Sequence, residues 1–166
     1  MRYKLKLYPD YCLTEKARLV RELDDNIKEL IEIMVTIMYG YKGIGLAAPQ
    51  VGFLYRIIIS DIGDGLISII NPEIIKESGK NQLEEGCLSL PGIFMDIVRS
   101  HSILVRGINI VGKNIEMELN GLKARVIKHE IDHLDGILII DYATVVQKFL
   151  LRDKLNDLKK MYEIRL

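Results

Sequence analysis

Apolar residues between Ile27 and Met38 recur at intervals of three and four positions, which predicts one face of an amphipathic helix. Either Asp24 or Asp25 can cap the start of this helix, and Gly40 can end it. The segment that follows, GIGLAAPQVG at 43–52, is rich in glycine and small residues. We expect this segment to form a loop.

The middle of the chain has the composition of β-strands. Residues 55–61 are largely β-branched and predict one strand, and residues 66–75 predict a second that Pro72 interrupts. Residues 77–86, ESGKNQLEEG, are polar and are expected to form a loop. Residues 101–121 predict two strands joined by a turn at the Gly-Lys-Asn of 112–114.

Two further helices are predicted near the C-terminus. Residues 122–135 read as a helix that Gly136 stops, and residues 145–164 as an amphipathic terminal helix. The predicted fold is α+β, with mixed or antiparallel strands packed around the central helix at 122–135 and with helices at both ends. We expect a single domain covering residues 1–166, because no repeat or linker interrupts the pattern.

Composition narrows the classes of function. The chain has 23 Lys plus Arg and 23 Asp plus Glu, so no overall basic charge favours DNA or an anionic membrane. The N-terminus lacks the apolar stretch of a signal peptide, and no apolar run is long enough for a membrane span. With only two cysteines, a disulfide framework is not expected. We therefore expect a cytoplasmic protein.

The predicted helix at 122–135 contains HEIDH, with two of the three histidines of the chain. Four residues complete about one helical turn, so His129 and His133 share a face and can bind one metal ion. Glu130 lies about 100° further around the helix, where it can reach a water on that metal. Histidines buried without a metal would need other partners, because burying unpaired ionisable groups costs several kcal/mol.

A catalytic metal needs a third protein ligand, and spacing alone leaves it open. One class of metalloproteases has a histidine six residues after the second, where this chain has Ile139. Another takes a downstream carboxylate, for which Asp153 has roughly the right spacing. The other candidates are Cys12, Cys87 and His101.

Three segments together resemble the signature motifs of peptide deformylases: GIGLAAPQ at 43–50, EGCLS at 85–89 and HEIDH at 129–133. They occur in the order and at the spacing of that family, and the terminal helix is similar to the form common in Gram-negative bacteria. The resemblance implies removal of the formyl group from the N-terminal formylmethionine of nascent polypeptides.

The resemblance also assigns roles. It implies that Cys87, His129 and His133 hold the metal, and that Glu130 is the general acid and base. It implies that the Gln50 side chain and the Leu88 N–H stabilise the oxyanion. It places an extended substrate beside Gly43 and Gly45 and the methionine side chain in an apolar pocket. The candidates for that pocket are Ile44, Leu122 and Val126.

The metal implied by the family is Fe²⁺, one per chain, which Zn²⁺, Ni²⁺ or Co²⁺ can replace. The implied partners are N-formylmethionyl nascent peptides, with the ribosome as a further partner docked on the basic terminal helix. Two alternatives stay open: another HExxH metalloprotease, and a deformylase-like domain without turnover.

Two neighbours of these motifs affect the expected site. Lys128 stands where the family usually has glutamine, so that a cation there either weakens a contact behind the metal or points to solvent. Glu85 and Arg99 match a carboxylate and an arginine that pair in the family. We expect this pair to steady the cysteine segment.

Overall fold

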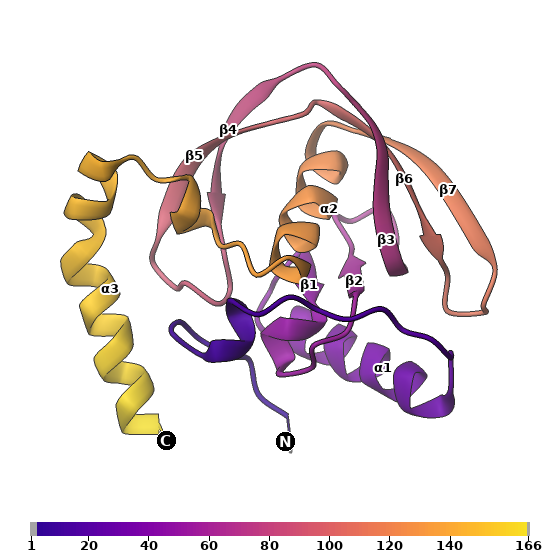
Figure 1. Ribbon diagram of the computed structural model, residues 1–166, viewed down its shortest axis with the longest axis horizontal. Coiled ribbons are helices and arrows are strands. Elements are labelled where there is room, and N and C mark those ends of the chain that lie inside the picture. Colours follow the sequence, from indigo (N-terminus) through magenta and orange to yellow (C-terminus); the bar gives the residue numbers. More distant parts are fainter. Residues whose placement is uncertain (1–2, 166) are drawn as a thin grey trace.

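The computed structural model describes residues 3–165 and has the expected α+β fold, built as one domain (Figure 1). A five-stranded antiparallel sheet has the order β1-β2-β3-β6-β7, and a separate hairpin pairs β4 with β5. The strands are β1 Gly45–Ala47, β2 Ile57–Ser60, β3 Ile67–Ser78, β4 Asn81–Gly86, β5 Phe94–Arg99, β6 Ser102–Ile108 and β7 Asn114–Asn120. The helices are α1 Asp25–Gly40, α2 Gly121–Leu134 and α3 Val145–Arg165.

Helix α1 forms where its apolar period predicts. Asp24 caps it by accepting a hydrogen bond from the Ile27 N–H, which is one of the donors left unpaired at a helix start. The buried stripe, including Met34 and Met38, packs against the Leu46 and Ile57 side chains of β1 and β2. This packing fixes the end of the helix beside the segment that begins the first motif.

The segment 43–52 is more ordered than the predicted loop. Gly45–Ala47 form β1, which pairs antiparallel with β2, and Ala48–Val51 form a short 3-10 helix. All three residues of β1 are buried. The composition of this segment does not predict the strand, because its small residues form β1 only when they are packed between other elements.

The predicted interruption at Pro72 is also wrong, because β3 runs unbroken through it. The β3–β6 register shifts between Ile70 and Glu73, which is a bulge that accommodates a residue without an N–H. Asn71 next to it adopts a φ of 53°. Its side chain exchanges hydrogen bonds with the N–H and C=O of Val20, so the bulge is held from outside the sheet.

The polar segment 77–86 is not a loop either, since it supplies the end of β3 and all of β4. Its partner β5 was not predicted, although its residues alternate between exposed and buried, with Met95 and Ile97 facing inward. The inward residue on β4 is Glu85, a carboxylate, so β4 lacks the alternation of apolar and polar residues that predicts a strand. The hairpin stands between α2 and α3 (Figure 1).

Helix α2 lies at the centre of the molecule, as predicted (Figure 1). Its Ala124, Ile127 and Leu134 pack with Ile58 and Ile69 of the sheet. Beyond its end, Gly136 has a φ of 72°, and a Cβ there would lie 2.4 Å from the Thr14 carbonyl oxygen. The chain can therefore turn tightly against the N-terminal segment only with glycine at this position.

Helix α3 is amphipathic only in part. Leu158 is buried, and Leu151 and Leu155 pack on the same apolar cluster beside the hairpin. The first two turns instead expose Val145, Val146, Phe149 and Leu150. Among the described residues, no helix is long and apolar enough to cross a membrane.

Candidate metal centre

Cys87, His129 and His133 converge on one point, and their potential ligand atoms all lie within 4.8 Å of one another. The two histidines stand one turn apart on α2, with ring centroids 5.0 Å apart. Cys87 comes from the turn after β4, and its Sγ lies 3.3 Å from His133 Nε2. Two imidazoles and a thiol are a donor set that suits a divalent transition metal.

The other candidates for a third ligand lie elsewhere. Cys12 is buried beside Asp10, whose carboxylate accepts a hydrogen bond from the Cys12 backbone N–H. His101 is exposed just before β6, and Asp153 is exposed on α3 beside Arg152. Of the four open possibilities, only Cys87 joins the two histidines.

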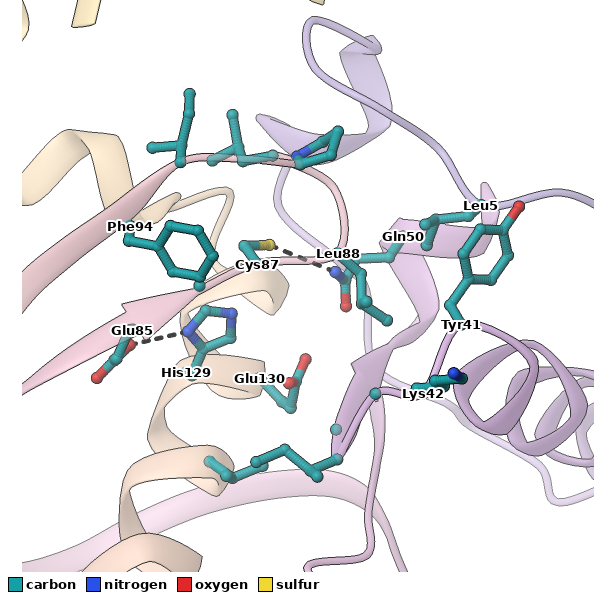
Figure 2. Close-up of a pocket in the computed structure, with 18 of the residues that line it drawn as sticks. Leu5, Tyr41, Lys42, Gln50, Glu85, Cys87, Leu88, Phe94, His129 and Glu130 are labelled. Carbon is teal, nitrogen blue, oxygen red and sulfur yellow. Dashed lines mark hydrogen bonds and ion pairs between the residues drawn. The ribbon is translucent and has the colours of Figure 1, made fainter.

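Glu130 is buried beside the cluster, as Figure 2 shows. Its Oε2 has no hydrogen-bond partner among the residues described. Burial raises the pKa of Glu130 to about 7, although the charges of His129 and Arg99 act in the opposite direction. A carboxylate with an unpaired oxygen and a pKa near neutrality is suited to accept and return a proton.

Gly45 provides the space that Glu130 occupies. A Cβ at this position would lie 2.4 Å from Glu130 Oε1 and 2.7 Å from Val126 Cγ1. Because Gly45 has no side chain, β1 can lie close to α2 at this point. The family resemblance implies room for substrate backbone at this glycine, whereas nothing in the sequence indicates its contact with Glu130.

Gln50 is buried in the 3-10 helix after β1, and both ends of its amide are held. Its Oε1 accepts a hydrogen bond from the Ala47 N–H at 2.8 Å. Its Nε2 donates to Ser89 Oγ at 3.1 Å and lies 3.7 Å from Cys87 Sγ. The amide N–H₂ group is thereby directed toward the cysteine segment. The Leu88 N–H, which belongs to the same segment, has no acceptor within residues 3–165.

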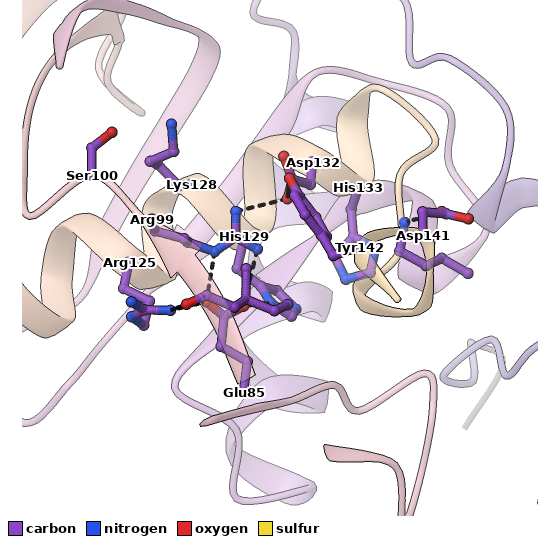
Figure 3. A network of polar contacts seen from close by, with 12 residues as sticks. Glu85, Arg99, Ser100, Arg125, Lys128, His129, Asp132, His133, Asp141 and Tyr142 are labelled. Atoms are coloured by element: carbon purple, nitrogen blue, oxygen red, sulfur yellow. Dashed lines mark hydrogen bonds and ion pairs between the residues drawn. The ribbon is translucent and has the colours of Figure 1, made fainter. Parts of the chain in front are cut away.

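Glu85 is the centre of a buried network behind the cluster (Figure 3). Its carboxylate accepts hydrogen bonds from Arg99 at 2.6 and 2.9 Å and from Arg125 at 2.5 Å. Its Oε2 also lies 2.9 Å from His129 Nδ1. The pairing with Arg99 follows the sequence expectation, but the contacts with Arg125 and His129 were missed. The sequence does contain one signal of these contacts. Arg125 stands among the apolar residues of α2, and a buried charge requires a partner.

The network extends from Arg99 to Asp132 and Tyr142. Arg99 donates to Asp132 at 2.8 Å, and the Tyr142 hydroxyl donates to the same carboxylate oxygen at 2.8 Å. Burial and the Asp132 charge raise the pKa of Tyr142 to about 12. The phenol therefore stays protonated and remains a donor.

The surroundings of the two histidines shift their pKa values in opposite directions. Burial by itself would lower the pKa of His129, but hydrogen bonds with Cys87 and Glu85 raise it well above the ordinary value. Burial lowers the pKa of His133 well below the ordinary value, and the neighbouring His129 acts in the same direction. A cation held between them favours the neutral form of both rings.

Lys128, the residue that departs from the family pattern, points away from the cluster. Its Nζ lies 2.5 Å from an oxygen of Glu77, at the end of β3. The Lys128 side chain is therefore neither behind the metal ligands nor free in solvent.

A cavity of about 750 Å³ opens over the site (Figure 2). Its inner lining includes Cys87, His129, Glu130 and Gln50. All five residues expected to contact substrate also line it: Gly43, Ile44, Gly45, Leu122 and Val126. Its size is typical of small-molecule and peptide sites.

The residues present fit a metal ion. The donor set supplies the three protein ligands of a site with an open position, and Glu130 Oε2, which has no partner among the described residues, belongs to the residue that follows His129. Glu85 accepts from Nδ1 of His129, which leaves Nε2 of that ring for a metal.

Comparison with known proteins agrees with this geometry. The family model for polypeptide deformylase matches residues 3–149. A peptide deformylase of Thermotoga maritima is 45% identical over 159 residues, covering 95% of this chain and 97% of the relative.

Two crystal structures show the same fold. The peptide deformylase of Legionella pneumophila has a TM-score of 0.90 at 36% identity and covers 96% of each chain. The peptide deformylase of Plasmodium falciparum has a TM-score of 0.91 at 39% identity, covering 97% of this chain and 98% of that one. These matches exclude the alternative of another HExxH protease class. The chain therefore belongs to the polypeptide deformylase family, metalloenzymes that remove the N-formyl group from nascent peptides.

Proposed function

We propose that Cys87, His129 and His133 hold one Fe²⁺ ion and that the chain uses it to hydrolyse N-formylmethionyl peptides. The observation that carries this proposal is the burial of Glu130 beside the three convergent ligand atoms, with one oxygen that has no partner in residues 3–165. When bound, the metal supplies Lewis acidity, which polarises a carbonyl and lowers the pKa of a water.

Glu130 is the proton carrier in this proposal. It takes the proton of the attacking water and returns it to the amine as the formamide bond breaks. Its pKa of about 7 suits both directions of transfer at neutral pH. Gly45 supports this role, because the absence of a Cβ leaves room for the Glu130 carboxylate.

Gln50 and Leu88 are the proposed donors to the developing oxyanion. The Gln50 carbonyl is held by the Ala47 N–H, so its Nε2 is oriented before substrate arrives. The Leu88 N–H lies one residue beyond Cys87 and has no acceptor among the described residues. Preorganised donors of this kind are worth about 3–4 kcal/mol each in the transition state.

The methionine side chain is proposed to lie against Ile44, Leu122 and Val126. Ile44 and Leu122 are exposed at 45% and 48%, which is consistent with side chains that a substrate covers. The backbone at Gly43 and Gly45 leads into β1, an edge strand of the sheet. An extended peptide can lie along such an edge.

The test of this function is formate release from formyl-Met-Ala-Ser by protein prepared without oxygen and loaded with Fe²⁺ or Zn²⁺. We expect turnover with both metals, much faster with iron, and loss of the iron activity in air as the metal and the Cys87 thiolate oxidise. No formate release with either metal contradicts the proposed function. Equal turnover with both metals and no loss in air contradicts only the choice of iron.

The proposed setting is the cytoplasm, at the ribosome. Lys148, Arg152 and Lys159 are exposed and fall at spacings of four and seven residues, so they share a face of α3. This basic face supports contact with ribosomal RNA. Co-sedimentation with ribosomes is expected to weaken when all three are changed to glutamate. Unchanged co-sedimentation contradicts the docking.

A further inference from the structure

Ser89 is a fully buried serine whose hydroxyl contacts the proposed oxyanion donor Gln50. Its Oγ accepts a hydrogen bond from Gln50 Nε2 at 3.1 Å. Burying a hydroxyl group costs free energy unless the group is hydrogen-bonded, and an alanine would fill nearly the same space without that cost. A serine at this position is therefore explained by its contact with the Gln50 amide.

The Gln50 amide carries one acceptor oxygen and two N–H donors, and its neighbours hold the oxygen and one of the donors. Oε1 accepts from the Ala47 N–H at 2.8 Å, and one Nε2 hydrogen is donated to Ser89 Oγ. If the amide oxygen and nitrogen exchanged places, the Nε2 group would face the Ala47 N–H, and two donors would oppose each other. The Ala47 contact thus decides which end of the amide donates, and the Ser89 contact sets the rotation of its plane.

The second Nε2 hydrogen is left for the cavity. Gln50 lines the cavity, and its Nε2 lies 3.7 Å from Cys87 Sγ, the contact that a dashed line marks in Figure 2. With the amide plane fixed by Ser89, this hydrogen is directed toward the side of the cavity where Cys87 meets the two histidines. A donor that is aimed before substrate binds does not have to reorient during the reaction.

One segment near the N-terminus holds the backbones of both residues. The Lys6 N–H donates to the Gln50 carbonyl at 2.8 Å, and the Tyr8 N–H donates to the Ser89 carbonyl at 2.9 Å. Gln50 and Ser89 are 39 positions apart in the chain, and this segment ties the 3-10 helix of one to the turn of the other. The hydroxyl and the amide therefore meet in a geometry that is already fixed without substrate.

We propose that Ser89 is a positioning residue, which orients the Gln50 amide so that its second N–H meets the oxyanion formed in the transition state. The inference rests on the proposed function, in which Gln50 donates to that oxyanion. Ser89 itself is not part of the cavity wall, so it acts only through Gln50. Its contribution should appear in kcat and not in KM, because the interaction that it supports exists only in the transition state.

The test is a double-mutant cycle on the metal-loaded protein with formyl-Met-Ala-Ser as substrate. Gln50→Ala should lower kcat by about 10²- to 10³-fold, the usual effect of removing an oxyanion donor. Ser89→Ala should lower kcat by about 10-fold and change KM by less than about twofold, because the donor is present but no longer aimed. In the Gln50→Ala background, which is the matched control, Ser89→Ala should change kcat by less than about twofold.

Metal content and circular dichroism are measured on every variant. An equal loss of kcat from Ser89→Ala in both backgrounds overturns the inference, because the hydroxyl would then act independently of Gln50. An unchanged kcat in Ser89→Ala overturns it as well, and so does a Ser89→Ala protein that fails to fold or to hold metal, because the role of Ser89 would then be structural. Failure of the wild type to release formate overturns the proposed function instead, and the inference falls with it.

Discussion

The Glu85 carboxylate lies 2.9 Å from Nδ1 of His129, and the same carboxylate is paired with two buried arginines. The β4–β5 hairpin thus fixes the ring of a residue on α2. A hydrogen bond at Nδ1 selects the tautomer whose Nε2 is free for a metal. The same strand ends at Gly86 and leads directly to Cys87, so one element positions two of the three proposed ligands.

Glu85→Gln should weaken metal binding by about 10- to 100-fold, because His129 loses an anionic partner that orients its ring. Competition with a chelator, followed by metal analysis, measures the change. Glu77→Gln is the control, since Glu77 pairs at the surface with Lys128, immediately before His129. Equal affinities in the Glu85 and Glu77 variants would contradict an orienting role for Glu85.

The stability of the apo-protein should depend on pH through Glu85. Burial acts to raise its pKa, but the hydrogen bonds from His129 and Arg99 dominate and lower it from 4.5 to about 2. A carboxylate with a lowered pKa stabilises the fold above pH 4.5 and loses that contribution as the pH falls toward 2.

Urea unfolding of the wild type and Glu85→Gln at several pH values tests this dependence. The free energies of unfolding should differ by about 3–5 kcal/mol near neutrality, because the variant leaves the buried Arg125 without a carboxylate partner and Arg99 with Asp132 alone. The difference should shrink below pH 4.5. A difference that stays constant down to pH 2.5 would show that another group is responsible.

Glu130→Gln should keep the metal and lose turnover by about 10²- to 10⁴-fold, because a neutral amide cannot carry the proton. Formate release and metal content are measured on the same sample. Activity within about tenfold of the wild type would argue against Glu130 as the general base.

Gly45→Ala should also lose activity while the protein stays folded. The added methyl group would lie 2.4 Å from Glu130 Oε1, so the carboxylate has to move from its place beside the cluster. Gly40→Ala is the matched control, because a Cβ there meets nothing within 4 Å. Circular dichroism checks the fold, and similar activities in the two variants would refute the spatial argument.

The sequence predicts the elements whose residues repeat with a clear period, and it fails where burial depends on a partner elsewhere. Helices α1 and α2 and the β6–β7 hairpin follow from local pattern. Strand β4 was missed because its inward residue is a glutamate, and the burial of Glu85 is possible only beside Arg99 and Arg125. In the same way, the motifs identify the ligand candidates by resemblance, whereas the fit of Gly45 against Glu130 exists only in the folded chain.

The two cysteines provide the last prediction, because spacing alone leaves both as candidate ligands, whereas the structure brings Cys87, which the resemblance also indicates, together with the two histidines. Cys87 Sγ lies 3.3 Å from His133 Nε2, whereas Cys12 is buried next to the Asp10 carboxylate. Burial raises the pKa of the Cys12 thiol, so it stays protonated.

Cys87→Ser should therefore weaken metal binding and remove most activity, since an alcohol is a much poorer ligand than a thiolate. Cys12→Ser should leave metal affinity unchanged and affect mainly stability, because it places a hydroxyl in a buried site. Metal analysis after dialysis and thermal unfolding of both variants measure these effects. Retention of full metal content by Cys87→Ser would rule out the thiolate as a ligand, and the site would then have to rely on the two histidines of α2.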